Sequence, residues 1–251
     1  MHEFLLPFER WEFGALDIHY PDSSTLREYF QLIPKLEAIP GNIVELGVAR
    51  GRSLITTGLI LNCLNSSKSL LGLDSFHGFP EYSPEDDFEN FEVLRASNLI
   101  SLEHFERVIR NAAHVKARGG DVHPSQISSS LDFSNTSIEY VQSRIDYLGL
   151  KERISIRVGD FSVDIEKLVR GEKFSLVLLD SDLFKSYANT LPVLWNQLSP
   201  GGLIYLDEYY SLKFPGPRMA VNAFMHSISN GKLIQLPSWM EFERWAIEKN
   251  L

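Results

Sequence analysis

The chain has 251 residues, of which 44% are hydrophobic and 23% are charged, a balance typical of globular proteins with a substantial core. Its net charge of −9 and its isoelectric point near 5.3 argue against nonspecific affinity for nucleic acid or for an anionic membrane. The sequence shows no signal peptide and no apolar run of membrane-spanning length, and its single cysteine cannot form an internal disulfide. We therefore expect a cytoplasmic protein with neither nucleic-acid nor membrane partners.

The first 24 residues are rich in aromatic side chains and prolines, which predicts irregular structure. Ser23 or Ser24 can cap a helix over 25–38, where apolar residues recur at helical spacing. We expect one domain over 1–251 that begins with an N-terminal segment of residues 1–40.

A short buried strand over 43–46 precedes an apolar helix over 53–65, and the turn between them carries Gly47 and Gly51. Glycine in such a turn lets backbone N–H groups approach a ligand closely. The pattern that begins at Glu45 is E-x-G-x-x-x-G, which does not have the G-x-G-x-x-G spacing of the dinucleotide fingerprint. It is not a P-loop either, because no lysine follows the second glycine. NAD and ATP are therefore disfavoured as ligands.

A second strand over 69–74 ends in Asp74, whose carboxylate could accept hydrogen bonds from ribose hydroxyls or simply serve a turn. The polar stretch over 80–132, which includes a helical run over 101–116, is long for a connection inside a compact domain. We interpret this stretch as a lid-like insertion over the active site.

The rest of the chain alternates helices and strands, which predicts a doubly wound α/β fold. Helices are expected over 137–148, 163–169, 185–198 and 217–228. Strands are expected over 154–158, 174–180 and 203–206, followed by a closing antiparallel pair over 233–236 and 242–247.

Four predicted strands end in an acid or in a turn that carries one, at Asp74, Asp160, Asp180 and Asp207. Asp180 and Asp182 follow one strand and Asp207 and Glu208 follow the next, so four carboxylates converge if these strands are neighbours. Such like charges repel one another unless a cation lies among them. Oxygen ligands without histidine or cysteine favour Mg²⁺ or Ca²⁺. The alternatives are that Asp180 caps the next helix and that Glu208 faces solvent.

Together these features resemble the macrocin (TylF/MycF-type) O-methyltransferases, from about residue 40 to about residue 228. The resemblance is carried by Glu45-Leu46-Gly47-Val48-x-x-Gly51-x-Ser53, Asp74-Ser75-Phe76-x-Gly78, Gly159-Asp160-Phe161, Leu179-Asp180-Ser181-Asp182-Leu183, Leu198-Ser199-Pro200-Gly201-Gly202, Asp207-Glu208-Tyr209 and Arg218-x-Ala220-Val221-x-x-Phe224. It implies an α/β, Rossmann-like class I methyltransferase fold with a seven-stranded, mostly parallel sheet, helices on both faces and a terminal antiparallel strand. It also implies Mg²⁺-dependent methylation of sugar hydroxyls in natural products, with S-adenosylmethionine (SAM) as the methyl donor.

The same resemblance implies roles for individual residues. The loop from Gly47 to Ser53 would lie against the methionine part of SAM, Asp74 would bind the ribose, and Asp160 with Phe161 would flank the adenine. Asp182, Asp207 and Glu208 match the metal ligands, and Asp180 matches a proposed general base. The expected cofactor-binding set is Glu45, Gly47, Val48, Ala49, Gly51, Ser53, Asp74, Ser75, Gly78, Asp160, Phe161 and Asp180. The family usually has two aspartates where this chain has Asp207-Glu208, and the longer glutamate shifts its ligand oxygens.

Several alternatives stay open. A catechol-type acceptor suits the same chemistry, because a metal can chelate vicinal oxygens in both cases. His77, or His104 or His123 in the insertion, could act as the base in place of Asp180. The intact acid set disfavours a non-catalytic SAM-binding partner protein, and the missing G-x-G-x-x-G disfavours a nucleotide-sugar oxidoreductase. The expected partners are a small-molecule hydroxyl acceptor and a second copy in a homodimer, with the aromatic N-terminal segment contributing contacts.

Overall fold

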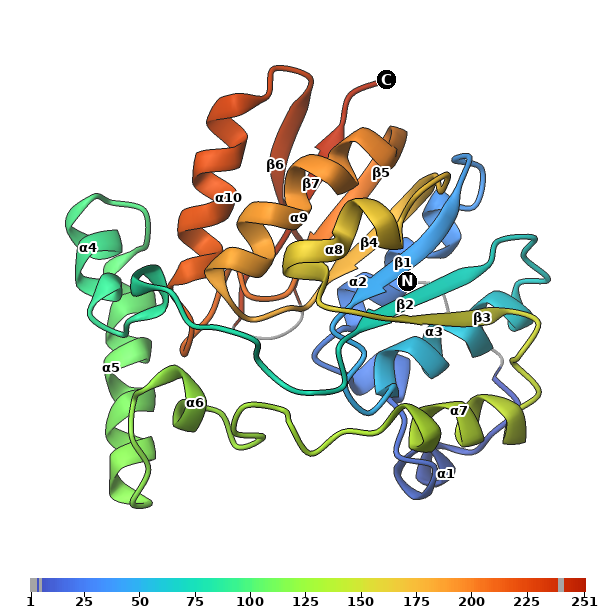
Figure 1. Ribbon diagram of the computed structural model, residues 1–251, viewed down its shortest axis with the longest axis horizontal. Helices are drawn as coiled ribbons and strands as arrows, with labels where there is room; N and C mark the ends of the chain where they lie inside the picture. The colour runs from blue at the N-terminus through green and yellow to red at the C-terminus, as the bar shows by residue number, and fades with distance from the viewer. Residues whose placement is uncertain (1–3, 5, 239–241) are drawn as a thin grey trace.

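The computed structural model describes residues 4, 6–238 and 242–251, and its centre is a seven-stranded sheet with the order β3-β2-β1-β4-β5-β7-β6 (Figure 1). Strands β1 to β5 run parallel, whereas β7 pairs antiparallel with both β5 and β6. The strands are β1 (Asn42–Leu46), β2 (Leu70–Asp74), β3 (Ile154–Val158), β4 (Phe174–Leu179), β5 (Leu198–Leu206), β6 (Gly231–Leu236) and β7 (Arg244–Lys249). The predicted sheet and its closing antiparallel pair are confirmed.

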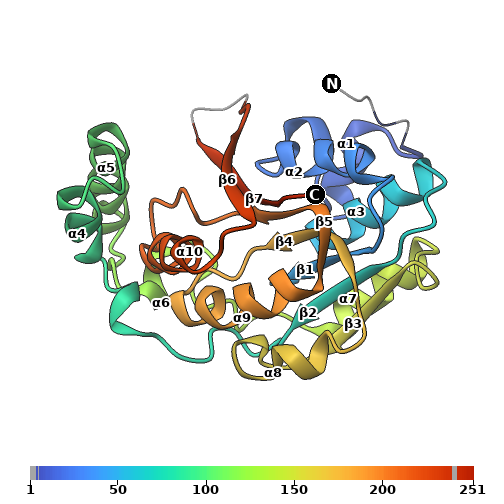
Figure 2. The same ribbon diagram turned by 90° about the horizontal axis from the view of Figure 1, so that it is seen from above.

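Helices cover both faces of the sheet (Figure 2). One face is covered by α2 (Arg27–Leu32), α3 (Arg52–Cys63) and α7 (Ile138–Tyr147), and the other by α8 (Phe161–Leu168), α9 (Phe184–Gln197) and α10 (Gly216–Ser227). All six residues of β4 are buried, because a strand covered on both faces needs apolar side chains on both. None of the described helices is long and apolar enough to cross a membrane.

The strand order reverses between β1 and β4, because the chain moves from β1 outward to β3 and then returns to the other side of β1. In open α/β sheets, ligands bind in the crevice beyond the carboxyl ends of the strands at this reversal. Leu46 at the end of β1 pairs with Leu73 of β2 and with Leu179 of β4. The turns that follow these three strands therefore begin side by side.

The start of the N-terminal segment is more regular than the sequence predicts. Helix α1 (Arg10–Ala15) lies in the stretch expected to be irregular, and a capping box between Glu9 and Glu12 closes its first turn. Residues 1–3 and 5 of the expected segment lie outside the described residues.

The prediction of one continuous helix over 25–38 is wrong. Helix α2 ends at Leu32, and a separate 3₁₀ turn, η2 (Pro34–Leu36), follows it. Proline lacks the N–H that continuing the α-helix would require. Neither Ser23 nor Ser24 occupies the cap position, which is Leu26; the Ser24 hydroxyl accepts a hydrogen bond from the Leu26 N–H at 3.1 Å.

The insertion expected over 80–132 forms helices that project from the sheet on the side of α10 (Figure 1). They are a 3₁₀ turn, η3 (Pro84–Asp86), α4 (Asn90–Ala96), α5 (Leu102–Ala117) and α6 (Pro124–Ile127). His104 of α5 contacts the Ser211 carbonyl oxygen at 2.8 Å, and Asn111 donates to the Leu212 carbonyl oxygen at 3.1 Å. The insertion is thus held against the loop that follows the acids at the end of β5.

Two predicted boundaries at strand ends also need correction. Helix α8 begins at Phe161 rather than at residue 163, because Asp160 caps it and accepts a hydrogen bond from the Ser162 N–H at 2.9 Å. Strand β5 begins at Leu198 rather than at residue 203, because a register shift in its pairing with β4 accommodates the Pro-Gly-Gly sequence.

Candidate active site

Three cavities meet at the carboxyl ends of β1, β2, β4 and β5. The strand-end cavity is lined by Gly47, Ala49, Asp74, Ser75, Gly78, Phe79, Pro80, Phe133, Gly159, Asp160, Phe161, Asp180, Ser181, Asp182 and Ser186. The N-terminal cavity lies between His19, the turn after β1 and a stretch from Ser129 to Thr136. The acid cavity contains Asp180, Asp182, Asp207 and Glu208, together with side chains from the loop after β5 and from β7. Asp180 and Phe133 line all three, so the cavities adjoin at these two side chains.

Gly47 and Gly51 shape the turn between β1 and α3 in different ways. Gly47 has a φ of +92°, and a Cβ there would overlap the backbone carbonyl oxygen of Asp180. Gly51, which precedes the first residue of α3, has a φ of +74°, and a Cβ there would lie 2.7 Å from Val141 Cγ1. Both positions therefore require glycine, for backbone conformation and for close approach.

Asp74 fixes the turns after β1 and β2 to each other. Its Oδ2 accepts a hydrogen bond from the Ala49 N–H and its Oδ1 from the Phe76 N–H, both at 2.7 Å. Ala49 and Phe76 have φ values of 47° and 55°, which residues with a Cβ adopt infrequently. A carboxylate oxygen has more than one lone pair, so Asp74 can hold these turns and still accept hydrogen bonds from a ligand in the strand-end cavity.

Aromatic side chains from the two ends of the insertion form part of the strand-end cavity, and sequence reasoning missed them. The rings of Phe79 and Phe133 lie 5.3 Å apart between centroids. The Phe79 N–H donates to the Asp132 carbonyl oxygen at 2.9 Å, which joins the two ends of the insertion. The one available signal was that both phenylalanines border the predicted insertion.

Glu45 supports the turn from beneath and does not line these cavities. It is fully buried, its Oε1 accepts a hydrogen bond from the Ser53 hydroxyl at 2.7 Å, and its Oε2 has no partner among the described residues. Desolvation raises the pKa of Glu45 to about 8; the Ser53 hydrogen bond opposes this rise and Asp74 adds to it. Glu45 is therefore held largely as the neutral acid at neutral pH.

We expect Glu45→Gln to remove part of the pH dependence of stability. A carboxyl group with a raised folded pKa stabilises the fold fully below its unfolded value, and this contribution is lost as pH rises through the folded value. With values of 4.5 unfolded and about 8 folded, wild-type protein should lose about 3 kcal/mol more than Glu45→Gln between about pH 5 and about pH 8. Urea unfolding at both pH values measures this loss, with Glu152→Gln, at an exposed site, as the control. Equal losses in wild type and Glu45→Gln would contradict the prediction.

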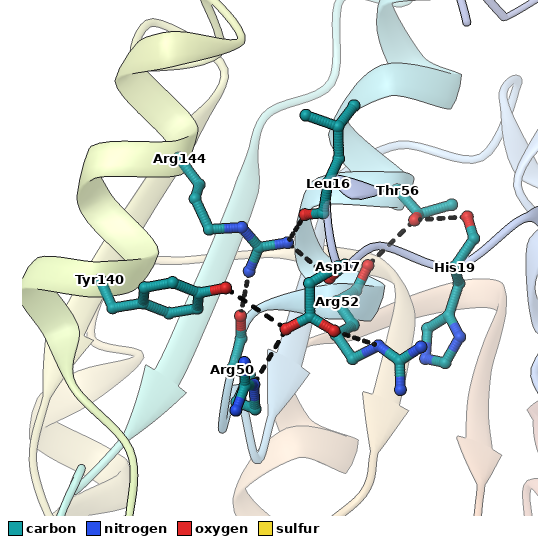
Figure 3. Close-up of polar contacts among 8 residues, drawn as sticks. All are labelled: Leu16, Asp17, His19, Arg50, Arg52, Thr56, Tyr140 and Arg144. Atoms are coloured by element: carbon teal, nitrogen blue, oxygen red, sulfur yellow. Dashed lines mark hydrogen bonds and ion pairs between the residues drawn. The ribbon is translucent and has the colours of Figure 1, made fainter. Parts of the chain in front are cut away.

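The N-terminal segment is attached to the turn after β1 by charged side chains (Figure 3). The Asp17 carboxylate accepts a hydrogen bond from Arg50 Nε at 2.9 Å and lies 3.4 Å from Arg52 Nε. His19 and Arg52 line the N-terminal cavity; sequence reasoning missed His19, whereas Arg52 lies in the loop from Gly47 to Ser53 that was expected to contact SAM. Desolvation lowers the pKa of His19 to about 4, with Arg52 adding to this effect and Asp17 opposing it. His19 is therefore neutral at neutral pH, and the arginines carry the positive charge of this cavity.

Arg144 of α7 connects three segments through its guanidinium (Figure 3). It donates hydrogen bonds to the carbonyl oxygens of Leu16, Asp17 and Arg50, at 2.5 to 2.6 Å. Because these carbonyls belong to the N-terminal segment and to the turn after β1, Arg144 fixes one wall of the N-terminal cavity to the other.

We expect Arg144→Met to destabilise the protein by about 2–4 kcal/mol, because three carbonyl groups lose a charged donor. Tyr140→Phe is the matched control. It removes only a hydroxyl that lies 3.4 Å from Asp17 Oδ2 and keeps the ring beside which Arg144 lies, 5.0 Å from its centroid. The control should cost at most about 0.5 kcal/mol. Urea denaturation measures both, and equal effects of the two substitutions would contradict a specific role for Arg144.

Three carboxylates gather where β4 and β5 end. One oxygen from each of Asp180, Asp207 and Glu208 lies within 4.8 Å of the others. They meet because β4 and β5 are parallel neighbours with Leu179 paired to Leu206. Glu208 is buried, and its Oε2 accepts a hydrogen bond from the Tyr187 hydroxyl at 2.6 Å. Of the four carboxylates predicted to converge, these three lie together.

This three-carboxylate group has the charge and the donor atoms of a hard-cation site. Desolvation raises the pKa of Asp180 well above its usual range, and Asp207 and Asp182 add to the rise. Desolvation likewise raises the pKa of Glu208, with Asp180 adding most among its neighbours. All donors are oxygen atoms, which suit Mg²⁺ or Ca²⁺ better than Zn²⁺. The residues therefore fit a divalent cation, whose charge would relieve the repulsion among them.

Asp182, predicted as a metal ligand, lies outside the three-carboxylate group, whereas Asp180, predicted as the base, belongs to it. The backbone of Asp182 has a φ of 60°, and its N–H lies 3.4 Å from Glu208 Oε2. Its side chain lines both the strand-end and the acid cavities. Desolvation raises the pKa of Asp182 to about 7, while the Lys213 ammonium opposes this rise and Asp207 adds to it.

A family model described as a methyltransferase domain matches residues 44–209, from β1 to the loop that follows the acids after β5. This match covers more than half of the chain. The chain belongs to this methyltransferase family.

The sequence identity to individual methyltransferases is low. The chain is 24% identical over 198 residues to mycinamicin III 3''-O-methyltransferase of Micromonospora griseorubida, covering 77% of this chain and 65% of that protein. It is 24% identical over 179 residues to 8-demethyl-8-(2,3-dimethoxy-alpha-L-rhamnosyl)-tetracenomycin-C 4'-O-methyltransferase of Streptomyces olivaceus, covering 69% and 54%. The chain thus spans less than two thirds of either curated relative. The solved structure of the O-methyltransferase NovP matches with a TM-score of 0.58 and 20% identity, over 89% of this chain and 80% of that one. This similarity shows the class I methyltransferase fold, as predicted.

Most site residues predicted for this methyltransferase line one of the three cavities. They are Gly47, Val48, Ala49, Ser53, Asp74, Ser75, Gly78, Asp160, Phe161, Asp180, Asp182, Asp207 and Glu208. Of the rest, Glu45 and Gly51 shape the turn from behind. His77, His104 and His123 do not line these cavities, and His104 instead stacks on Tyr210 with ring centroids 4.0 Å apart. Their positions give no support to a histidine base.

Proposed function

We propose that this methyltransferase transfers the methyl group of SAM to a hydroxyl on the sugar of a glycosylated natural product, as a macrocin-type enzyme. The observation that carries the proposal is the position of Asp180, which lines the strand-end, N-terminal and acid cavities. Asp180 thus borders both the cavities proposed for the methyl donor and the cavity proposed for the acceptor. Both curated relatives are named as O-methyltransferases, one of them for a rhamnosyl-tetracenomycin, which supports a sugar as the acceptor.

SAM would occupy the strand-end and N-terminal cavities. In the strand-end cavity, Asp74 would accept hydrogen bonds from the ribose hydroxyls, and Asp160 and Phe161 would flank the adenine. The methionine part would extend along the turn after β1 into the N-terminal cavity. There the positive end of α3 and the guanidinium of Arg52 favour the cofactor's carboxylate.

Asp207, Glu208 and one oxygen of Asp180 would hold Mg²⁺, with Asp182 beside them. When bound, Mg²⁺ supplies positive charge that lowers the pKa of a nearby hydroxyl and makes it a better nucleophile. The second oxygen of Asp180 stays available to accept a proton.

In the reaction, the acceptor oxygen forms a bond to the methyl carbon while the bond from that carbon to sulfur breaks. The hydroxyl proton passes to Asp180, and S-adenosylhomocysteine is the second product. The rate of such a displacement depends mainly on the alignment of nucleophile and methyl group. Phe133, which borders all three cavities, would help to exclude water from the junction where this alignment occurs.

The proposal is tested by incubating the protein with methyl-labelled SAM and methyl α-L-rhamnopyranoside, in Mg²⁺ or in EDTA. We expect a labelled methyl ether in Mg²⁺ and at least about 10-fold less in EDTA. Pyrocatechol is included as a second acceptor, and labelling of pyrocatechol alone would contradict a sugar acceptor. Binding of SAM without transfer to either probe would contradict the proposed activity.

A further inference from the structure

The acid cavity contains two positively charged side chains besides its carboxylates, Lys213 and Arg244. Arg244 is the first residue of β7, and the next residue, Trp245, pairs with Leu206 at the end of β5. Arg244 therefore lies beside Asp207, which directly follows β5. Trp245 packs on the face of the sheet covered by α9 and α10, so the side chain of Arg244 lies on the opposite face.

The side chain of Arg244 is buried, and its Nε has no hydrogen-bond partner among the described residues. The residue is only 6% exposed. Within residues 4, 6–238 and 242–251 its side chain makes no hydrogen bond and no ion pair, and its Nε is a fully buried donor without an acceptor. Its Cζ lies 5.7 Å from the ring centroid of Phe242. Buried donors are nearly always paired, so Nε is expected to have a partner that the described residues do not supply.

The missing partner is an oxygen atom rather than another negative charge. Burial opposes the charged form of Arg244, but Asp207, Tyr205 and Glu28 outweigh it and raise the pKa of the guanidinium above its ordinary value. Arg244 thus remains charged and already has countercharge around it. What these neighbours do not provide is an acceptor atom within hydrogen-bond distance of its N–H groups.

We propose that Arg244 donates hydrogen bonds to oxygen atoms of the acceptor that neighbour the methylated hydroxyl, and so selects polyhydroxylated acceptors. The inference rests on the proposed function, because the acceptor must enter the acid cavity beside Asp180. The planar fork of guanidinium N–H groups suits two adjacent oxygens, such as the vicinal hydroxyls of a sugar. Arg244 is then a specificity-determining residue and not only a counterion of the acids.

Arg244→Lys keeps the positive charge but removes the fork, and Arg218→Lys is a matched control. Arg218 also has a buried Nε without a partner, but it lies 3.9 Å from the Tyr209 ring centroid and does not line the acid cavity. With methyl α-L-rhamnopyranoside as acceptor, Arg244→Lys should raise the acceptor KM by about 10- to 100-fold, the loss expected for a hydrogen bond from a charged donor. Arg218→Lys should change this KM by less than about two-fold.

Two further readouts separate acceptor recognition from a structural role. The Kd for S-adenosylhomocysteine, measured by calorimetry, and the melting temperature should be the same in Arg244→Lys and wild type. An unchanged acceptor KM in Arg244→Lys would overturn the proposal, because a counterion needs only its charge. Parallel losses of S-adenosylhomocysteine affinity and melting temperature would overturn it too, because they would mark Arg244 as structural.

If the wild-type protein methylates no glycoside, the proposed function is wrong. A binding measurement still tests the inference about Arg244 in that case. The ¹⁵N-labelled Nε–H resonance of Arg244, assigned by its absence in Arg244→Lys, is followed while the S-adenosylhomocysteine complex is titrated with the rhamnoside. A shift of this resonance supports acceptor binding by Arg244 without turnover. No shift up to the solubility limit of the rhamnoside would overturn the inference.

Discussion

Replacing Asp180 with asparagine is expected to lower the rate of methyl transfer by about 10²- to 10⁴-fold, the usual effect of losing a positioned general base. The amide keeps the shape of the side chain but cannot take the hydroxyl proton. The substitution should not destabilise the fold. Burial and the neighbouring Asp207 raise the pKa of Asp180 in the folded state. The ionisable group therefore lowers the stability of the folded state at any pH above its pKa in the unfolded chain. In EDTA at about pH 8, the melting temperature of Asp180→Asn should therefore equal or exceed that of wild type.

Asp164→Asn, at an exposed site on α8, is the control and should keep both rate and melting temperature. Single-turnover assays and calorimetric scans provide the measurements. A rate for Asp180→Asn within about three-fold of wild type would exclude Asp180 as the base. A loss of SAM affinity that matches the loss of rate would assign Asp180 to cofactor binding instead.

Gly47→Ala is expected to destabilise the protein by about 4 kcal/mol or more, the upper end for a single substitution. The added Cβ would overlap the carbonyl oxygen of Asp180, and a φ of +92° is strained for alanine. Neither backbone can move away cheaply. The Gly47 N–H donates to the Leu73 carbonyl oxygen and the Asp180 N–H to the Leu46 carbonyl oxygen, both at 3.0 Å. The cofactor site should be lost together with this turn.

Gly171→Ala separates steric overlap from backbone strain. Gly171 has a similar φ of +79°, but a Cβ there meets nothing within 4 Å, so the substitution should cost about 1 kcal/mol. Urea unfolding of the two variants gives the difference. Equal losses would show that the contact between the turns after β1 and β4 does not constrain residue 47.

The centre of the sheet could be predicted because β1, β2 and β4 are short, buried and parallel. Strand β3 matches its predicted range, and β1 begins one residue earlier than expected. Such strands form continuous apolar runs between helices, and strands that follow one another in the chain are neighbours in most cases. The meeting of Asp180 with Asp207 and Glu208 follows from that adjacency alone.

The remaining site residues depend on contacts that no local pattern encodes. His19, Phe133 and Arg244 come from the N-terminal segment, the end of the insertion and the last strand, and each reaches the site only through tertiary packing. The roles of Asp180 and Asp182 could not be separated by spacing, because both lie in one turn. Asp182 has a left-handed backbone and lies outside the three-carboxylate group, and sequence alone reveals neither feature.

All of the proposed chemistry requires SAM to bind in the strand-end and N-terminal cavities, and calorimetric titration of the wild-type protein with SAM measures this binding directly. ATP and NADH serve as control ligands, because they share the adenosine part but carry phosphates that this turn has no motif to bind. We predict a Kd for SAM in the micromolar range, in Mg²⁺ and in EDTA alike, and no comparable binding of the controls. No heat with SAM, or equal affinity for ATP, would contradict the account.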